Sequence, residues 1–242
     1  MALKQIVESF PFDSGPIYQE TLAGRLPVEP FNTYSNILFL GIIIYFSLKV
    51  YRDYHNHRFL AWSLPVLLLG FIGGTVYHAT RSHDVWMYMD WLPIVILCLA
   101  VSVYYTIKLK ATRKQRLLLI LIILFLVFGI RMIPWPVSLK TSIGYIGTAV
   151  GLLLPIITYF FTTRTHYWWW VFLAFLSFGL AISFRLMDRF VYVMPMGTHW
   201  LWHVFGAISV FFLIKFIYED RRTQMFADSN AALRNKASKG KV

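Results

Sequence analysis

Long apolar runs, separated by short polar or basic segments, follow one another along almost the whole chain. A helix needs about 20 mostly apolar residues to cross the hydrocarbon core of a bilayer. Seven runs meet this requirement: residues 32–51, 59–80, 84–106, 115–132, 141–162, 167–184 and 196–218. The pattern therefore predicts an all-α integral membrane protein built as a bundle of seven transmembrane helices.

The same pattern divides the chain into three parts. Residues 1–31 form a polar N-terminal segment, residues 32–218 the membrane domain and residues 219–242 a basic tail. The N-terminal segment lacks the continuous apolar core of a signal peptide, so we expect the first span to insert by itself. We expect the polar tail to be partly disordered.

Composition supports a membrane protein over other classes. Of the 242 residues, 58% are hydrophobic and only 14% are charged, whereas soluble domains carry about 25% charged residues. The single cysteine, Cys98, excludes a disulfide scaffold, and the apolar content excludes a disordered chain.

The formal net charge of +12 is unevenly distributed. Most lysines and arginines follow spans one, three, five and seven, and basic loops are retained in the cytoplasm. We therefore expect the N-terminus outside and the C-terminus in the cytoplasm. No polar basic face accompanies a DNA- or RNA-binding motif, so no nucleic-acid partner is expected.

A few ionisable residues interrupt the spans, and each is a candidate for function because such groups are costly inside a membrane. With a rise of about 1.5 Å per residue, His78 lies about 3 Å below the outer edge, Asp90 about 9 Å, and His199 and His203 about 4 to 10 Å. Three spans thus bring three imidazoles and a carboxylate into one layer near the non-cytoplasmic face.

These four residues are the ones that metal-assisted hydrolysis requires. His199 and His203 are four positions apart and project from one side of a helix, and His78 completes a set of three nitrogen ligands that leaves an open position on zinc. Zinc lowers the pKa of water to about 7, and Asp90 could accept and return the proton. The alternative is that each histidine is an interhelical hydrogen-bond donor.

The other intramembrane charges have structural interpretations. Arg185 and Asp188 are three apart and are expected to form an ion pair. Lys215 is expected to extend to the cytoplasmic interface, and its position there disfavours a retinal-binding protein. Cys98 lies mid-span and is expected to be inert packing.

The sequence G-G-T-V-Y-H at 73–78, Asp90 and H-W-L-W-H at 199–203 together resemble the CREST superfamily of seven-span membrane hydrolases. This group includes alkaline ceramidases and the progestin and adiponectin receptor family. The resemblance implies zinc on His78, His199 and His203, with Asp90 holding the reacting water. The family usually has a serine where this chain has Gly74, and Thr75 is the residue that could supply the hydroxyl instead.

A second similarity lies before the first span, where E-P-F-N-T-Y-S-N at 29–36 is similar to alkaline ceramidases. In that branch this region binds Ca²⁺, which prefers several oxygen ligands. The positions here that could do so are Asp13, Glu20, Glu29 and Asn32. The alternative is that Glu29, Pro30 and Asn32 only form the turn and cap that begin the first span.

These observations predict a zinc-dependent hydrolase that cleaves an amide, or less favourably an ester, in a membrane lipid. The alternative is a seven-span lipid-responsive receptor with a structural zinc site. The site would face the non-cytoplasmic side. Short loops and the lack of a retrieval signal favour a bacterial inner membrane, with an endomembrane as the alternative.

Overall fold

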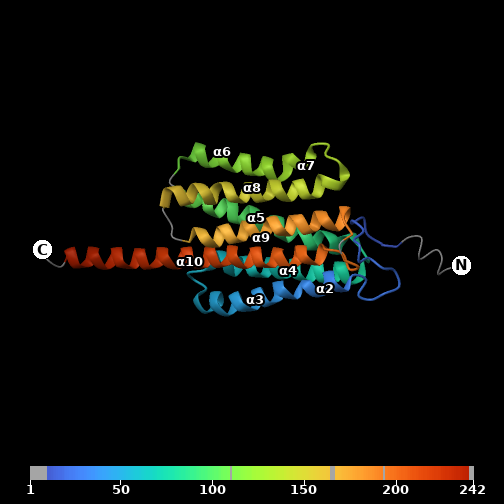
Figure 1. Cartoon of the computed structure of the whole chain (residues 1–242). Coiled ribbons are helices and arrows are strands. Elements are labelled where there is room, and N and C mark those ends of the chain that lie inside the picture. Colours follow the sequence, from blue (N-terminus) through green and yellow to red (C-terminus); the bar gives the residue numbers. More distant parts are fainter. Residues whose placement is uncertain (1–9, 110, 164–166, 193, 240–242) are drawn as a thin grey trace.

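The computed structural model describes residues 10–109, 111–163, 167–192 and 194–239, which form a bundle of long helices (Figure 1). No strand occurs in these ranges. Seven helical stretches are long and apolar enough to cross a membrane: Pro30–Asp53, Arg58–Thr80, Asp84–Lys108, Arg113–Met132, Leu139–Thr163, Trp168–Phe190 and His199–Ala227. The prediction of an all-α chain with seven such helices is confirmed.

The helices follow the apolar runs closely, and several spans consist of more than one element. In chain order the elements are α2 (Pro30–Ser35), α3 (Ile37–Val50), the 3-10 turn η1 (Tyr51–Asp53), α4 (Arg58–Thr80), α5 (Asp84–Lys108), α6 (Arg113–Leu124), the π-helical segment η2 (Phe125–Gly129), α7 (Ile130–Met132), α8 (Val137–Thr163), α9 (Trp168–Phe190) and α10 (His199–Lys239).

Local chemistry sets several helix ends. Thr112 and Gln115 form a capping box that begins α6, which satisfies backbone N–H groups that have no partner inside the helix. Helix α4 ends at Arg81, whose φ of 48° is left-handed. That conformation is unfavourable for a residue with a side chain, and the contacts of Arg81 described below hold it in place.

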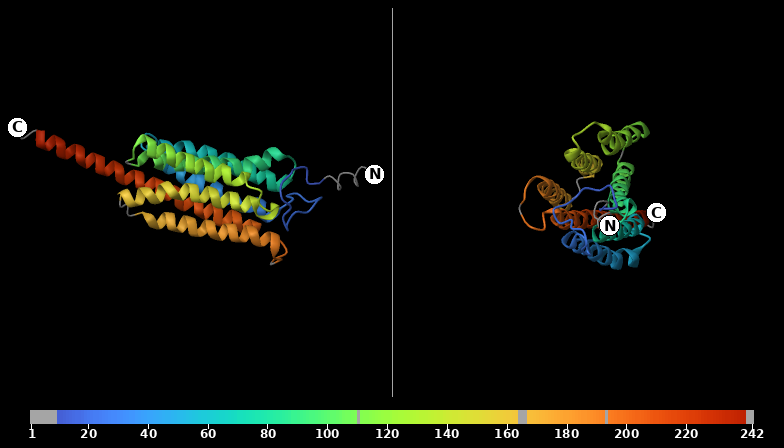
Figure 2. Two further views of the ribbon diagram at one scale, coloured as in Figure 1. Left: turned by 90° about the horizontal axis from the view of Figure 1, so that it is seen from above. Right: turned by 90° about the vertical axis from the view of Figure 1, so that its right-hand side faces the viewer.

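Helix α10 lies at the centre of the packing. It packs against α9 and also contacts α2, α3 and α4, while α4 packs on α5 and α5 on α8. The fourth span, α6 to α7, packs mainly on α8 and lies at the edge of the bundle (Figures 1 and 2). The main buried apolar core joins α3, α4, α5, α8, α9 and α10 and includes Phe46, Leu64, Tyr105, Ile156 and Phe216. Ile123 and Val127 of the fourth span form a second, smaller cluster with Val95 of α5.

The two ends of the described chain lie at opposite ends of the bundle (Figure 2). Residues 10–29, the part of the N-terminal segment that the structure describes before α2, pack against one end of the bundle. Helix α10 projects from the other end. From here on, the N-terminal segment means residues 10–29. The expectation of a partly disordered tail is wrong as far as Lys239, because α10 remains helical to that residue. Residues 219–239 contain no glycine or proline and many good helix formers.

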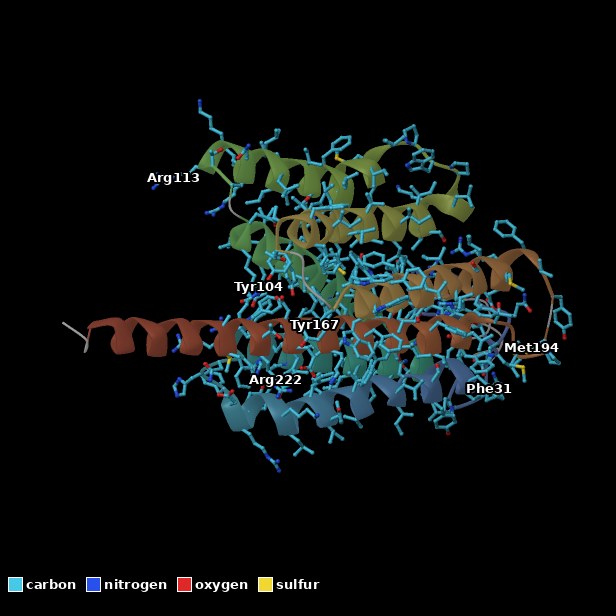
Figure 3. The ribbon with its side chains drawn as sticks, turned by 60° about the vertical axis from the view of Figure 1, so that its left-hand side comes forward. Phe31, Tyr104, Arg113, Tyr167, Met194 and Arg222 are labelled. Carbon is cyan, nitrogen blue, oxygen red and sulfur yellow. The ribbon has the colours of Figure 1, made fainter. Side chains whose placement is uncertain are left out.

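A buried polar cluster, called here the aspartate cluster, joins three helices near the end from which α10 projects. Asp220 of α10 accepts hydrogen bonds from Tyr159 (2.9 Å), Lys108 (3.0 Å), Gln224 (3.0 Å) and Tyr105 (3.4 Å). Arg113 and Arg222 mark this end of the molecule, whereas Phe31 and Met194 mark the other (Figure 3).

Candidate metal centre

Three histidines, called here the histidine cluster, meet at the end of the bundle covered by the N-terminal segment. His78 lies in the last turn of α4, His199 begins α10, and His203 follows one turn later. Each ring offers one nitrogen, and these nitrogens lie within 4.8 Å of one another. All three side chains are buried, at 0 to 3% exposed. The predicted convergence of the three imidazoles is confirmed.

Two of the rings are held by acceptors on their outer nitrogens. Nδ1 of His78 lies 2.5 Å from Oε2 of Glu29, and Nδ1 of His203 lies 2.9 Å from Oδ1 of Asn36. A carboxylate or carbonyl that accepts the second N–H of a histidine fixes the ring and its tautomer, as in protein metal sites. Glu29 and Asn36 therefore orient the two rings and leave Nε2 of each without a partner in the protein.

The free nitrogens are the observation that points to a metal. Nε2 of His78, Nε2 of His203 and Nδ1 of His199 are buried and have no hydrogen-bond partner. Buried polar atoms are almost always paired, so three such atoms in one cluster require an explanation. A metal ion bound by neutral imidazoles would satisfy them, and the residues present therefore fit a metal.

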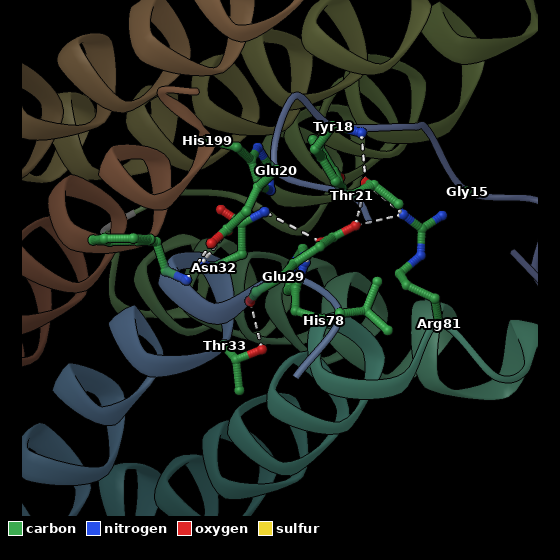
Figure 4. Close-up of polar contacts among 12 residues, drawn as sticks. Gly15, Tyr18, Glu20, Thr21, Glu29, Asn32, Thr33, His78, Arg81 and His199 are labelled. Carbon is green, nitrogen blue, oxygen red and sulfur yellow. Dashed lines mark hydrogen bonds and ion pairs between the residues drawn. The ribbon is translucent and has the colours of Figure 1, made fainter. Parts of the chain in front are cut away.

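The N-terminal segment covers this cluster from outside the helices (Figure 4). Tyr18 stacks on His199 with ring centroids 3.8 Å apart and an interplanar angle of 23°. Burial raises the pKa of Tyr18, so its phenol is neutral. At Gly15, an added Cβ would lie 2.1 Å from the hydroxyl of Tyr77, so this position cannot carry a side chain without a shift.

Arg81 fastens the segment to the bundle. Its guanidinium bonds Asp13 at 2.7 and 2.8 Å and Glu29 at 2.7 Å, and all three side chains are fully buried. Burial alone would raise the pKa of Glu29, but the hydrogen bond from His78 and the charge of Arg81 outweigh it and lower the pKa to about 2. Glu29 is therefore an ionised acceptor for His78.

The arrangement gives no support to the calcium prediction. The carboxylates of Asp13 and Glu29 are neutralised by Arg81, and those of Glu20 accept from the backbone N–H groups of Phe31 and Asn32 at 2.6 and 3.0 Å. The Asn32 amide donates to Glu29. Among the described residues, the histidine cluster is the one group of three or more potential metal ligands that meets at a point. Glu29 and Asn32 thus stabilise the start of the first span, and Glu29 also fixes the ring of His78.

Asp90 lies beside the histidine cluster because two glycines let α4 and α5 approach closely. A Cβ added at Gly73 would lie 2.3 Å from the Cβ of Met89, and one at Gly74 would lie 2.4 Å from Oδ1 of Asp90. A serine at position 74 would therefore require the Asp90 carboxylate to shift. Asp90 has no hydrogen-bond partner among the described residues and faces a cavity that His203 also lines.

The role of Thr75 in place of the missing serine stays a prediction. Its hydroxyl is buried without a hydrogen-bond partner, and it is not one of the residues that line this cavity.

The cavity runs from Asp90 and His203 into the apolar centre of the bundle. Its walls come from α3, α4, α5, α8, α9 and α10, and Cys98, Phe175 and Leu213 lie along it. From His203 to Leu213 the rise along α10 is about 15 Å. Cys98, expected to be inert packing, thus lies on a wall that a ligand could contact.

The predicted ion pair between Arg185 and Asp188 is wrong. Oδ1 of Asp188 instead accepts from the backbone N–H groups of Thr198 at 2.7 Å and His199 at 3.0 Å. A carboxylate stabilises a helix N-terminus through its free N–H groups and the helix dipole. Asp188 therefore caps the N-terminus of α10 and fixes the backbone of His199, a candidate metal ligand.

Several residues of the site were not predicted in their roles, namely Tyr18, Asn36, Arg81 and Asp188. Asn36 had a usable signal, because it ends the E-P-F-N-T-Y-S-N run that enters the first span on the same side as the histidines. The contacts of Tyr18, Arg81 and Asp188 join segments far apart in the chain, and no spacing in the sequence signals them.

No protein-family model matches this chain, and no curated protein sequence matches it. The resemblance to the CREST superfamily therefore stays a prediction that rests on the motifs in spans two, three and seven.

Proposed function

We propose that the protein is a membrane-embedded zinc hydrolase that cleaves an amide, or less favourably an ester, in a lipid. The observation that carries this proposal is the group of unpaired imidazole nitrogens at one end of an apolar cavity, which His203 and Asp90 both line. A purely structural cluster would pair these atoms within the protein.

The donor set favours zinc. Three imidazoles are the ligand set of catalytic zinc sites, which keep one position open. When bound, zinc supplies a Lewis acid for the carbonyl and a water with a pKa of about 7. Glu29 and Asn36 would hold the rings of His78 and His203 for this purpose.

Asp90 is the residue we propose for proton transfer. Its carboxylate is free of protein partners, and it shares the cavity with His203. It can accept a proton from the attacking water and return it to the leaving group. The apolar walls beyond it would hold the acyl chain, so that the polar linkage lies beside Asp90 and the histidine cluster.

The test is release of fatty acid from a panel of lipid amides and esters by the purified protein, together with its metal content. Asp90→Asn is expected to keep the metal and to lower turnover by about 10²- to 10⁴-fold. His199→Ala is expected to lose both.

Hydrolysis by Asp90→Asn at the parent rate would contradict the proton-transfer role. A metal-loaded protein that binds lipid but releases no product from any of them would favour the receptor alternative, with zinc as a structural ion.

A further inference from the structure

Two arginines that lie against the Tyr145 ring, Arg185 and Arg131, are called here the arginine pair. The Arg185 side chain is 5% exposed, and its one recorded hydrogen bond is a long one of 3.4 Å to the hydroxyl of Ser142. Arg131 donates to the carbonyl of Val127 at 2.9 Å and to the hydroxyl of Thr148 at 3.3 Å. Neither makes an ion pair within the described part of the chain.

This lack of a counter-charge sets the pair apart from other buried cations in the molecule. Arg81 is paired with Asp13 and Glu29, and Lys108 with Asp220. A charged group inside a membrane bundle normally pairs with another or lines a functional site. Asp188, three residues after Arg185, is occupied by the start of α10.

The pair lies behind residues that line the cavity, and neither arginine is itself a lining residue. The guanidinium carbons of Arg185 and Arg131 lie 5.5 and 5.8 Å from the centre of the Tyr145 ring, and that of Arg185 is 5.8 Å from Trp202. Tyr145 and Trp202 both line the cavity, as do Asp90 and His203. Thr148, which accepts from Arg131, is another lining residue.

We propose that the arginine pair binds an anionic oxygen group, a carboxylate or a phosphate, of the lipid held in this cavity. This inference rests on the proposed function and specifies its substrate class: the lipid carries a negative charge close to the bond that is cleaved. A guanidinium binds both oxyanions with paired N–H donors, and the low dielectric of the bundle strengthens the interaction. With a neutral lipid, Arg185 would remain without an ion-pair partner among the described residues.

The test compares three lipids that share one chain and differ in the head group: oleate, oleyl phosphate and oleyl alcohol. Binding to the purified, metal-loaded protein in neutral detergent is measured by equilibrium dialysis. At least one anion is expected to bind about tenfold or more tightly than the alcohol. The tighter of the two identifies the carboxylate or the phosphate, and competition by inorganic phosphate alone would show that the anion needs no lipid chain.

Arg185→Gln and Arg131→Gln should each remove most of this preference without loss of the metal. Arg113→Gln is the matched control, since it removes the same charge from an exposed position at the opposite end of the bundle (Figure 3). The preference should persist after the metal is removed with a chelator, because the metal could itself attract an anion.

A wild-type protein that binds all three lipids equally would overturn the inference, and so would full preference in Arg185→Gln with intact metal content. If Arg185→Gln does not fold, two other variants replace it. Arg185→Lys is expected to lose part of the preference for the anionic lipid, and Arg131→Gln is expected to lose more of it. Anion preference without hydrolysis would refute the proposed function alone, whereas hydrolysis of neutral amides without anion preference would refute this inference alone.

Discussion

Helix α10 takes part in a buried polar cluster at each end of the bundle, and the two clusters differ in how their atoms are paired. In the aspartate cluster, Asp220 accepts from four donors, and none of the polar side-chain atoms involved is buried without a partner. In the histidine cluster, three ring nitrogens are buried without a partner.

This difference in pairing suits the aspartate cluster to holding helices together and the histidine cluster to binding a ligand. A fully paired polar network stabilises the contact of the helices that supply it, and a water-free interior makes an unpaired polar atom costly. The unpaired nitrogens would therefore be unfavourable unless a ligand completes them. The fixed rings of His78 and His203 are ready for such a ligand, whereas the aspartate cluster has no free group to offer one.

The largest expected effect is the loss of metal on removal of one histidine. His203→Ala leaves two imidazoles, whereas the proposed site needs three protein ligands. We therefore expect bound metal, measured by elemental analysis, to fall from one equivalent to none. Asp220→Asn, the matched change in the other cluster, should retain a full equivalent. Equal metal content in both variants would show that the two clusters do not differ as proposed.

A smaller effect is expected when the support of a histidine is removed but the ring remains. Asn36→Ala takes the acceptor from Nδ1 of His203, and loss of such a partner weakens metal affinity by about 10- to 100-fold. Competition with a chelator of known affinity measures this change. Ser35→Ala is the control at the preceding position, because the Ser35 hydroxyl donates to the backbone carbonyl of Asn32. This variant should bind metal like the wild type. Equal weakening of metal affinity in both variants would indicate a general disturbance of span one.

The aspartate cluster should respond in stability and not in metal affinity. Asp220→Asn removes the charge that pairs with Lys108 and weakens four hydrogen bonds, at a cost of about 1–3 kcal/mol in the free energy of unfolding. Glu219→Gln, which affects the more exposed pairs with Lys215 and Arg222, should cost about 0–1 kcal/mol. Denaturant unfolding in detergent compares the two, and equal destabilisation would place no special weight on Asp220.

The smallest expected effect is that of calcium. Arg81 already neutralises Asp13 and Glu29, so a calcium-selective chelator should change neither the thermal unfolding temperature nor lipid turnover of the metal-loaded protein. A fall in either quantity that added calcium restores would show that the N-terminal segment binds the ion.

Much of the fold could be predicted from the sequence because membrane spans are encoded locally. The runs that end at Thr80 and begin at Asp84 were placed to the residue by apolar length and polar punctuation. The depth of His78, His199 and His203 followed from the direction of each span and a fixed rise per residue. Their shared layer needed no knowledge of which helices are neighbours, whereas the meeting of the three rings depends on the contact of α4 with α10.

The partners of these residues could not be predicted in the same way. Asp188 was expected to pair with Arg185, three positions away, yet it caps α10 because the loop returns Thr198 and His199 to it. The tail beyond Asp220 was expected to be partly disordered because it is polar, but helix propensity extends α10 through it. The spacing of Arg185 and Asp188 is outweighed by the free N–H groups at the start of α10, and the polarity of the tail is outweighed by its helix propensity.

Sequence alone determined that this chain forms seven helices long and apolar enough to cross a membrane and which residues reach one layer of the bundle, since the hydrophobic length and the helical rise are properties of each segment by itself. Only the tertiary structure decided which ring nitrogens are held and which are free, because that depends on side-chain directions across helices and on the N-terminal segment that covers them. The same packing also left Arg185 without an acidic partner, which no local pattern could reveal.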